Sequence, residues 1–195
     1  DRRLHWRTKG SASAEIRGAA SSDYSTVSDQ PIRFSSHARP IVSVVIPTYG
    51  QHDVTRRCLA SLAAEVEEIA CEVIVIDDAF IEPFDPEALR VSGVRVIRND
   101  QNLGFLLSCN RAVAAAPGDY VLLLNNDTVV HAGAMRALLT TFDQFDNVGA
   151  ACAQLRFEDD SLQEAGGIVW RDGSAWNWGR GEDPADPRFC YPREV

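Results

Sequence analysis

Short apolar runs along the chain alternate with longer segments in which apolar residues recur at helical spacing. Continuous apolar runs bounded by turn residues are typical of strands buried in a parallel sheet. The predicted strands are 41–46, which Pro47 is expected to end, 72–76, 94–97, 120–124 and 148–157. The predicted helices are 53–67, with Asp53 as its expected N-cap, 105–116 and 132–145. Strands alternating with such helices indicate βαβ units, hence an α/β fold with a mostly parallel sheet flanked by helices.

The two ends of the chain have a different character. Residues 1–40 are rich in Ser, Ala and Arg without a sustained period, which predicts a linker or the tail of a preceding segment. The folded domain is expected to span 41–195. Turn-forming residues cluster at 166–181, and Asp172-Gly173 between short apolar pieces predicts a hairpin. The chain stops at Val195 without a closing element, so we expect a domain that is incomplete at its C-terminal side.

Polar side chains follow three of the predicted strands, at the point where each strand ends. They are Pro47-Thr48-Tyr49 after the first, Asp77-Asp78 after the second, and Asn125-Asn126-Asp127 after the run at 120–124, which we expect to be buried on both faces. In an open parallel sheet, the carboxyl ends of the strands form the edge at which ligands bind. Three less specific interpretations stay open. Asp127 or Thr128 could cap the next helix, Asp77-Asp78 could form a solvated turn, and Tyr49 could cover the core.

Composition narrows the classes of function. The formal net charge of −9 argues against a general nucleic-acid binder, and no apolar run approaches the length of a membrane span. Five cysteines without a CxxC pair predict small core residues in a reducing compartment. Residues 1–40 carry seven basic and four acidic residues, so the rest is strongly acidic. Such a domain needs a metal ion or a cluster of donors to bind an anionic nucleotide, and oxygen ligands suit Mg²⁺ or Mn²⁺.

Four of these segments, in this order, resemble the family 2 inverting glycosyltransferases, which have the nucleotide-sugar-binding GT-A fold. The segments are 41–49, 73–78, 102–105 with Asn110, and 118–128. The resemblance implies metal-dependent transfer of a sugar from a nucleotide-diphosphate donor to a glycan or lipid-linked saccharide, with inversion. The asparagines before Asp127 are similar to a rhamnosyltransferase-like branch that builds bacterial surface polysaccharides. We therefore expect a cytoplasmic protein, with any membrane contact at the inner face.

The resemblance also implies a role for each matching residue. Pro47, Thr48 and Tyr49 would line the base pocket, and Asp78 would contact the base while Asp77 supports its loop. The donor pocket near the diphosphate would be shaped by Asn102, Gly104 and Asn110. Asn125 and Asn126 would lie near the ribose and the water shell of the metal. Asp127 would bind the metal, Mg²⁺ or Mn²⁺, which stabilises the charge on the leaving diphosphate.

The chain departs from the family pattern in two places, and one catalytic group is missing. Ala79-Phe80 stand where Gly-Ser usually follow the paired aspartates, and Gly50 stands where Asn is common. Inversion needs a general base. The resemblance implies an acidic residue well beyond the metal motif, after a further strand, so we expect it beyond Val195. Glu164, Glu182 and Asp183 are weighed for this role, but none lies in a matching context.

Other functions are weighed against this one. A non-catalytic nucleotide-binding or assembly module with the same fold is the alternative, since the turn is altered and the base is missing. A nucleotidyltransferase and a dinucleotide-dependent oxidoreductase are both disfavoured, because no glycine-rich phosphate loop follows the first strand. Trp170, Trp176 and Trp178 form either an aromatic platform for sugar rings or an anchor for a hairpin.

Overall fold

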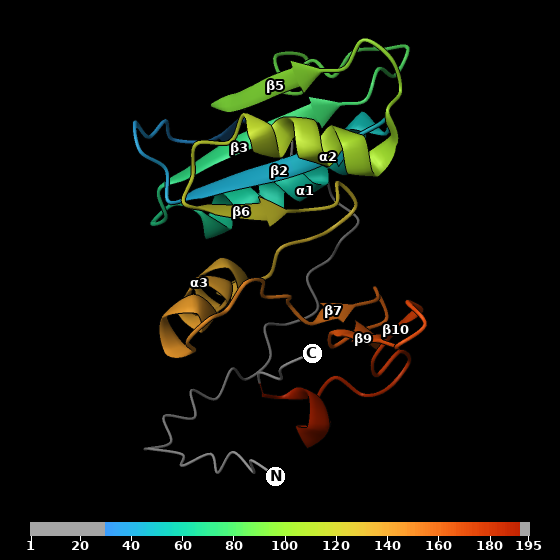
Figure 1. Ribbon diagram of the computed structural model, residues 1–195. Coiled ribbons are helices and arrows are strands. Elements are labelled where there is room, and N and C mark those ends of the chain that lie inside the picture. Colours follow the sequence, from blue (N-terminus) through green and yellow to red (C-terminus); the bar gives the residue numbers. More distant parts are fainter. Residues whose placement is uncertain (1–29, 192–195) are drawn as a thin grey trace. The chain divides into compact units, whose positions relative to one another are not determined.

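A four-stranded parallel sheet is the centre of the fold, as the apolar runs predict (Figure 1). The computed structural model describes residues 30–191. The strand order is β5-β3-β2-β6, and all neighbours are parallel. The bounds are β2 Val42–Thr48, β3 Cys71–Asp77, β5 Val94–Arg98 and β6 Tyr120–Leu123. The carboxyl ends of these strands therefore point to one edge of the sheet.

Pro47 lies inside β2, although the sequence predicts that it ends the strand. The carbonyl of Val45 accepts a hydrogen bond from Leu124 N on the β6 side. Pro47 follows Val45 by two residues, so its backbone faces β6 as well. The pairing of β2 with β6 ends at Leu123, before it reaches Pro47. Its missing N–H therefore removes no ladder hydrogen bond, which is the condition under which proline is tolerated in a strand.

Two helices cover opposite faces of the sheet (Figure 1). Alternate residues of β2 point to the two helices in turn. Val44 and Ile46 pack in one core cluster with α1 (His52–Glu65), which contributes Leu59 and Leu62. Val45 packs in a second cluster with Ala112 of α2 (Gly104–Ala114). This period of two is what a strand buried on both faces requires. The N-cap predicted for the first helix is wrong, because Gln51 occupies that position and makes no side-chain capping bond.

The strand β6 is half-buried, which corrects the expectation that it is buried on both faces. Tyr120 and Leu122 pack against the α1-side core, whereas Val121 and Leu123 are 41% and 50% exposed. The reason is its place at the end of the strand order, since α2 packs over β2 and β3 and leaves β6 uncovered on that face. An unbroken apolar run thus does not distinguish a central strand from an edge strand.

A short strand precedes the predicted domain boundary. β1 (Ile32–Arg33) pairs in parallel with β4 (Val91–Ser92), and Ile32 is buried in the α1-side core. Folded structure in the described part of the chain thus begins before residue 41. The division into a linker at 1–40 and a domain at 41–195 stays a prediction, and residues 1–29 lie outside the described residues.

The last part of the chain consists of one helix and short strands. After α3 (Ala134–Gln144) come β7 (Leu155–Arg156), β8 (Leu162–Glu164), β9 (Gly167–Val169), β10 (Ala175–Asn177) and a 3₁₀ turn, η1 (Pro187–Phe189). The strand predicted at 148–157 is wrong except for β7, whose partner β8 is itself only three residues long. The predicted hairpin at Asp172-Gly173 is confirmed as the antiparallel pair β9–β10.

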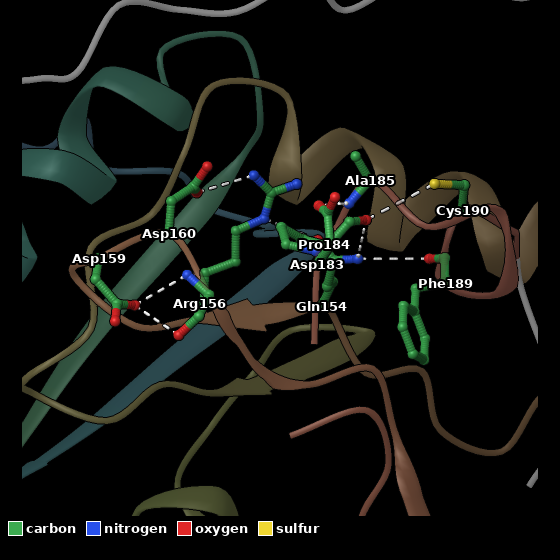
Figure 2. A network of polar contacts seen from close by, with 10 residues as sticks. Gln154, Arg156, Asp159, Asp160, Asp183, Pro184, Ala185, Phe189 and Cys190 are labelled. Atoms are coloured by element: carbon green, nitrogen blue, oxygen red, sulfur yellow. Dashed lines mark hydrogen bonds and ion pairs between the residues drawn. The ribbon is translucent and has the colours of Figure 1, made fainter. Parts of the chain in front are cut away.

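Polar contacts tie the segments of this last part to one another (Figure 2). The amide of Gln154 donates to the carbonyls of Pro184 and Phe189, 3.4 Å each. Arg156 bonds Gln154 at 2.9 Å and Asp160 at 3.0 Å. Exposed pairs of this kind add little stability. Leu162 and Phe189 are the buried apolar side chains that β8 and η1 contribute to this part. No helix in residues 30–191 has the length and apolar character needed to cross a bilayer.

Candidate functional site

A pocket of about 280 Å³ lies where β2, β3 and β6 end. All three polar strand ends singled out in the sequence contribute to it. Its lining consists of Pro47, Thr48, Tyr49, Asp78, Phe105, Ser108, Asn125, Asn126 and Asp127. The lining holds two carboxylates and no Lys or Arg. The parallel topology therefore brings together residues that lie up to eighty positions apart in sequence.

Asp78 is buried and its carboxylate is held by four donors. Oδ1 accepts from Asn99 Nδ2 at 2.7 Å, Leu103 N at 2.8 Å and Ser108 Oγ at 2.9 Å, and Oδ2 accepts from Gly104 N at 2.8 Å. Burial by itself raises the pKa of Asp78, but these hydrogen bonds outweigh it and hold the pKa below the ordinary aspartate value. The carboxylate is thus ionised and fixed in orientation.

Asp78 also takes the place of an N-cap for α2. The residue before this helix, Leu103, makes no side-chain capping bond. The N–H groups of Leu103 and Gly104, which a helix start leaves without partners, donate to Asp78 from β3 instead. A carboxylate at the positive end of the helix dipole is favourable as well. The strand end and the helix start are therefore locked together at the pocket.

The neighbouring Asp77 holds the loop that follows β3. It is 1% exposed and accepts from Phe80 N at 3.3 Å and Phe84 N at 3.0 Å. It also forms an ion pair with Arg98, whose other nitrogen donates to the carbonyl of Phe80 at 2.7 Å. The alternative that the two aspartates form a solvated turn is therefore wrong, because both are buried.

The altered turn Ala79-Phe80 builds an aromatic contact beside the pocket. Ala79 adopts φ 63°, a left-handed conformation that glycine takes more easily. Phe80 packs edge-on against Tyr49, with ring centroids 5.1 Å apart. The ring of Phe80 also lies 3.0 Å from the position that a Cβ at residue 50 would take, so Gly50 leaves room for it. Tyr49 is 53% exposed and lines the pocket, so it does not act as a cover over the core.

A chain of hydrogen bonds joins the ends of β2 and β6 through α1. Asn126 Nδ2 donates to Thr55 Oγ1 at 3.0 Å, and Thr55 Oγ1 lies 2.9 Å from Thr48 Oγ1. Thr48 Oγ1 in turn donates to the carbonyl of Gly50 at 3.0 Å. Thr48 and Thr55 are both buried. Because the amide nitrogen of Asn126 points to Thr55, its carbonyl oxygen is left for another ligand.

Asp127 is exposed at the rim of the pocket and does not cap the following helix. That helix begins at Ala134, its N-cap is Gly133, and no side chain caps it. Thr128 is likewise not a cap, and its N–H closes a turn on the carbonyl of Asn125 at 3.2 Å. The capping alternative is therefore wrong. The charge of Asp127 also affects a neighbouring thiol. The pKa of Cys58 is raised to about 12, first by burial of the thiol and second by the negative charge of Asp127.

The donor set at this rim fits a hard divalent cation. Asp127 offers a carboxylate and the neighbouring asparagines offer amide oxygens, and no residue of the described chain forms an ion pair with Asp127. No group of three or more His, Cys, Asp or Glu suited to a metal is present among the described residues. A single protein carboxylate is typical of Mg²⁺ sites that are completed by substrate phosphates and water.

Other predicted residues lie outside the pocket lining. Asn102 accepts from Gly104 N at 3.0 Å, so both residues shape the segment that holds Asp78. Asn110 is exposed on α2 and contributes nothing to the lining. The carboxylates weighed as general bases also lie elsewhere: Glu182 pairs with Arg188, Asp183 accepts from Ala185 N, and Glu164 accepts from Cys152.

Four residues of the site were missed by reading the sequence. Phe105 and Ser108 line the pocket. Asn99 lies outside the lining and donates to Asp78, and Thr55, also outside it, accepts from Asn126. The spacing of three between Phe105 and Ser108 places them on one side of a helix, which is a usable indication. Nothing local distinguishes Asn99 or Thr55, because their importance comes from partners far away in sequence.

Comparison with known proteins identifies the family of the chain. The family model for glycosyl transferase family 2 matches residues 43–184. An uncharacterised protein of Mycobacterium tuberculosis is 31% identical over 130 residues, covering 65% of this chain and 40% of that protein. The O-antigen biosynthesis protein RfbC of Myxococcus xanthus is 26% identical over 190 residues, covering 92% of this chain and 14% of that protein.

Two further similar proteins carry more specific names. An N-acetylglucosaminyltransferase of Bradyrhizobium elkanii is 29% identical over 122 residues, covering 60% of this chain and 66% of that protein. A solved mannosyltransferase of Pyrobaculum calidifontis, in complex with GDP-Man and Mn²⁺, has a TM-score of 0.49 at 21% identity, covering 60% of this chain and 36% of that one. The chain thus spans less than half of three of these four proteins.

Proposed function

The chain belongs to glycosyl transferase family 2, and from this premise we propose that its pocket binds the nucleotide of a nucleotide-diphosphate sugar for transfer to an acceptor. The observation that carries the proposal is the meeting of three strand ends in one pocket, with one buried and one exposed carboxylate. Such a pocket, at the carboxyl edge of a parallel sheet, is where this type of fold binds ligands. We assign a different role to each carboxylate, Asp78 at the nucleoside and Asp127 at the diphosphate.

Asp78 and the aromatic residues are suited to the nucleoside. Asp78 Oδ2 has one protein donor, so it can accept a further hydrogen bond from a base N–H or a ribose hydroxyl. Tyr49 and Phe105 are both more than half exposed and line the pocket, so they can stack on a base. Because α2 and the loop after β3 are anchored to Asp78 and Asp77, these contacts are held in place before the donor arrives.

Asp127 is suited to the diphosphate through a metal ion. The pocket lining has no cation of its own, so a dianionic diphosphate needs a counter-charge there. Mg²⁺ or Mn²⁺ would be held by Asp127 with the amide oxygens of Asn125 and Asn126, and the ion supplies charge neutralisation for the leaving diphosphate. The protein's own part is to position this carboxylate through the turn at Asn125 and the Asn126–Thr55 bond.

Transfer with inversion requires a general base near the acceptor hydroxyl. Apart from Asp78 and Asp127, no carboxylate among residues 30–191 lines the pocket. The lowered pKa of Asp78 makes its carboxylate a weak base. We therefore place the base outside the described pocket. The O-antigen biosynthesis relative supports an acceptor that is a glycan or lipid-linked saccharide of a bacterial surface polysaccharide. A non-catalytic nucleotide-binding or assembly module is the second candidate, favoured by this missing base.

Calorimetric titration with UDP, dTDP and GDP, each with Mn²⁺ and with a chelator, tests the donor site. We expect one nucleotide to bind in a metal-dependent way. In Asp127→Asn the metal-dependent affinity should fall at least about tenfold, as loss of metal-site groups does. The matched control is Asp119→Asn, an exposed aspartate at the opposite end of β6, which should bind like the parent chain.

The outcomes separate the two candidates. Absence of binding to all three nucleotides contradicts the donor-site proposal. Metal-dependent binding together with release of nucleotide from the matching donor sugar supports the transferase. Binding without any release of nucleotide, with or without added acceptor glycan, favours the non-catalytic module if it is also found with the full-length protein.

A further inference from the structure

Two tryptophans stand exposed on the β9–β10 hairpin. Trp170 is 54% and Trp176 is 69% exposed. A third, Trp178, packs edge-on against the buried Phe189 with ring centroids 4.7 Å apart, so it holds the hairpin to the rest of this segment. The anchoring role considered for these tryptophans is thus filled by Trp178. Large exposed aromatic side chains beside one another usually mark a binding surface.

The hairpin register places both exposed rings on one face. Trp176 lies opposite Ile168, and Trp170 follows Ile168 by two residues, which returns to the same face of the ribbon. Val169 pairs with Ala175 and faces the other way. Trp170 and Trp176 line a common open hollow with Arg171, Asp172 and Ser174. The two indoles therefore share their hollow with polar groups of the hairpin turn.

The polar groups in this hollow match a sugar better than an apolar partner. Asp172 accepts from Ser174 N at 3.0 Å and from Ser174 Oγ at 2.7 Å, and both bonds end on Oδ1. Its Oδ2 can therefore accept from hydroxyl groups, and the exposed Arg171 guanidinium can donate to them. Aromatic faces bind the apolar C–H face of a pyranose, and planar polar side chains bind its hydroxyls.

Charge selects among the possible ligands. The hollow holds one Arg and one Asp, so it carries no net charge to attract an anion. The whole chain has a formal charge of −9, which repels nucleotides without a metal and anionic lipid surfaces. We propose that Trp170 and Trp176, with Arg171 and Asp172, form a binding site for a neutral glycan chain. The site rests on the proposed function, in which such a glycan is the acceptor or the growing product.

Titration of the 195-residue chain with chitohexaose, mannohexaose, maltohexaose and cellohexaose tests this site, with calorimetry and tryptophan fluorescence as readouts. We expect at least one of them to bind and to change the fluorescence. Trp170→Ala and Trp176→Ala should each weaken binding about fivefold to tenfold, the order of one aromatic contact. Val169→Thr, at a residue 76% exposed on the opposite face, is the matched control and should bind unchanged.

Nucleotide titrations and thermal unfolding of the same variants complete the test. Loss of glycan binding with nucleotide binding and Tm unchanged supports the site. Glycan binding that survives in both tryptophan variants overturns it, and so does loss of both ligands with a lowered Tm, which would show a structural role. No binding of any hexasaccharide by a chain that binds nucleotide overturns this site alone. Binding to lipid vesicles without binding to glycans overturns it in favour of a membrane surface.

Discussion

Asp78 is the residue at which fold and site are most closely coupled. Its four hydrogen-bond donors come from a loop, a helix start and a helix interior, so one carboxylate joins β3 to α2. Hydrogen bonds to an ionised, buried carboxylate are among the stronger ones in proteins. Replacing it disturbs stability as well as binding, and the two effects have to be measured separately.

Asp78→Asn should lower the free energy of unfolding by about 2–3 kcal/mol, because an amide N–H₂ would face donors that then lack an acceptor. The pKa of Asp78 is lowered in the folded state, so its stabilising effect is complete above the unfolded pKa of about 3.9 and is lost as the pH falls through the lower, folded-state value. Urea unfolding between about pH 7 and pH 3 measures this.

The Asp78→Asn variant should therefore lose less stability on acidification than the parent chain. Asp143→Asn, at an exposed aspartate on α3, serves as the control and should follow the parent at every pH. Equal stability of Asp78→Asn and the parent at neutral pH would contradict the hydrogen-bond network described here.

Ala79 is a second residue whose effect on stability can be measured, because its backbone is strained. Its φ of 63° is left-handed, which costs an L-residue about 1–2 kcal/mol relative to glycine, less the extra chain entropy of glycine in the unfolded state. Ala79→Gly should raise the free energy of unfolding by about 0.5–1 kcal/mol in urea titration. Ala137→Gly, in the exposed middle of α3, should lower it by about 1 kcal/mol. A destabilised Ala79→Gly variant would exclude strain at this turn.

At the scale of elements, the approach of β6 to β2 depends on a glycine just before β6. A Cβ at Gly118 would lie 2.6 Å from Ser43 N, which is a backbone atom that has no room to move. Gly118 N also donates to Ser43 Oγ at 2.9 Å. The sequence indicates only that Pro117-Gly118 end a helix, so the close contact is a fact of the tertiary structure.

Gly118→Ala should therefore destabilise the protein by about 2 kcal/mol, because overpacking against backbone forces the strands apart. Gly149→Ala is the matched control, since nothing lies within 4 Å of a Cβ there and its φ is not left-handed. Thermal unfolding of both variants decides the point: a Gly118→Ala protein as stable as Gly149→Ala would show that β6 can shift without cost.

At the scale of the whole molecule, the reactivity of the five cysteines shows which parts of the chain are buried. Cys58, Cys71 and Cys109 are buried, and Cys152 and Cys190 are exposed. Burial raises the pKa of Cys58 to about 12 and that of Cys71 to about 11, so neither is a thiolate near neutral pH. This agrees with the prediction that most of the cysteines are core residues.

Iodoacetamide should accordingly modify two thiols in the native protein and all five in urea, as counted by mass spectrometry. Cys190 should react before Cys152, because partial burial of the Cys152 sulfur and the neighbouring Glu164 raise the pKa of Cys152. Cys190→Ser should remove the fastest step and leave the other rates unchanged. Modification of Cys58 at the native rate of Cys190 would mean that α1 and β2 are not packed as described.

The periodicity of apolar residues was sufficient to predict the parallel sheet, its four strands and the helices between them, because that information is local to each segment. The parallel order then implied that the polar ends at Thr48, Asp78 and Asp127 meet at one edge, and the pocket contains all three. The roles given to these residues stay predictions until nucleotide binding is measured.

What the sequence left open depends on contacts between segments that lie far apart in the chain. The apolar run at 120–124 did not show that β6 is an edge strand, because that follows from the strand order alone. The buried partners Asn99 and Ser108 became part of the site only because α2 and the end of β5 fold against Asp78. Local patterns therefore decided the elements and their order, while tertiary packing decided which side chains are buried, fixed and shared, since only packing brings distant polar atoms within bonding distance.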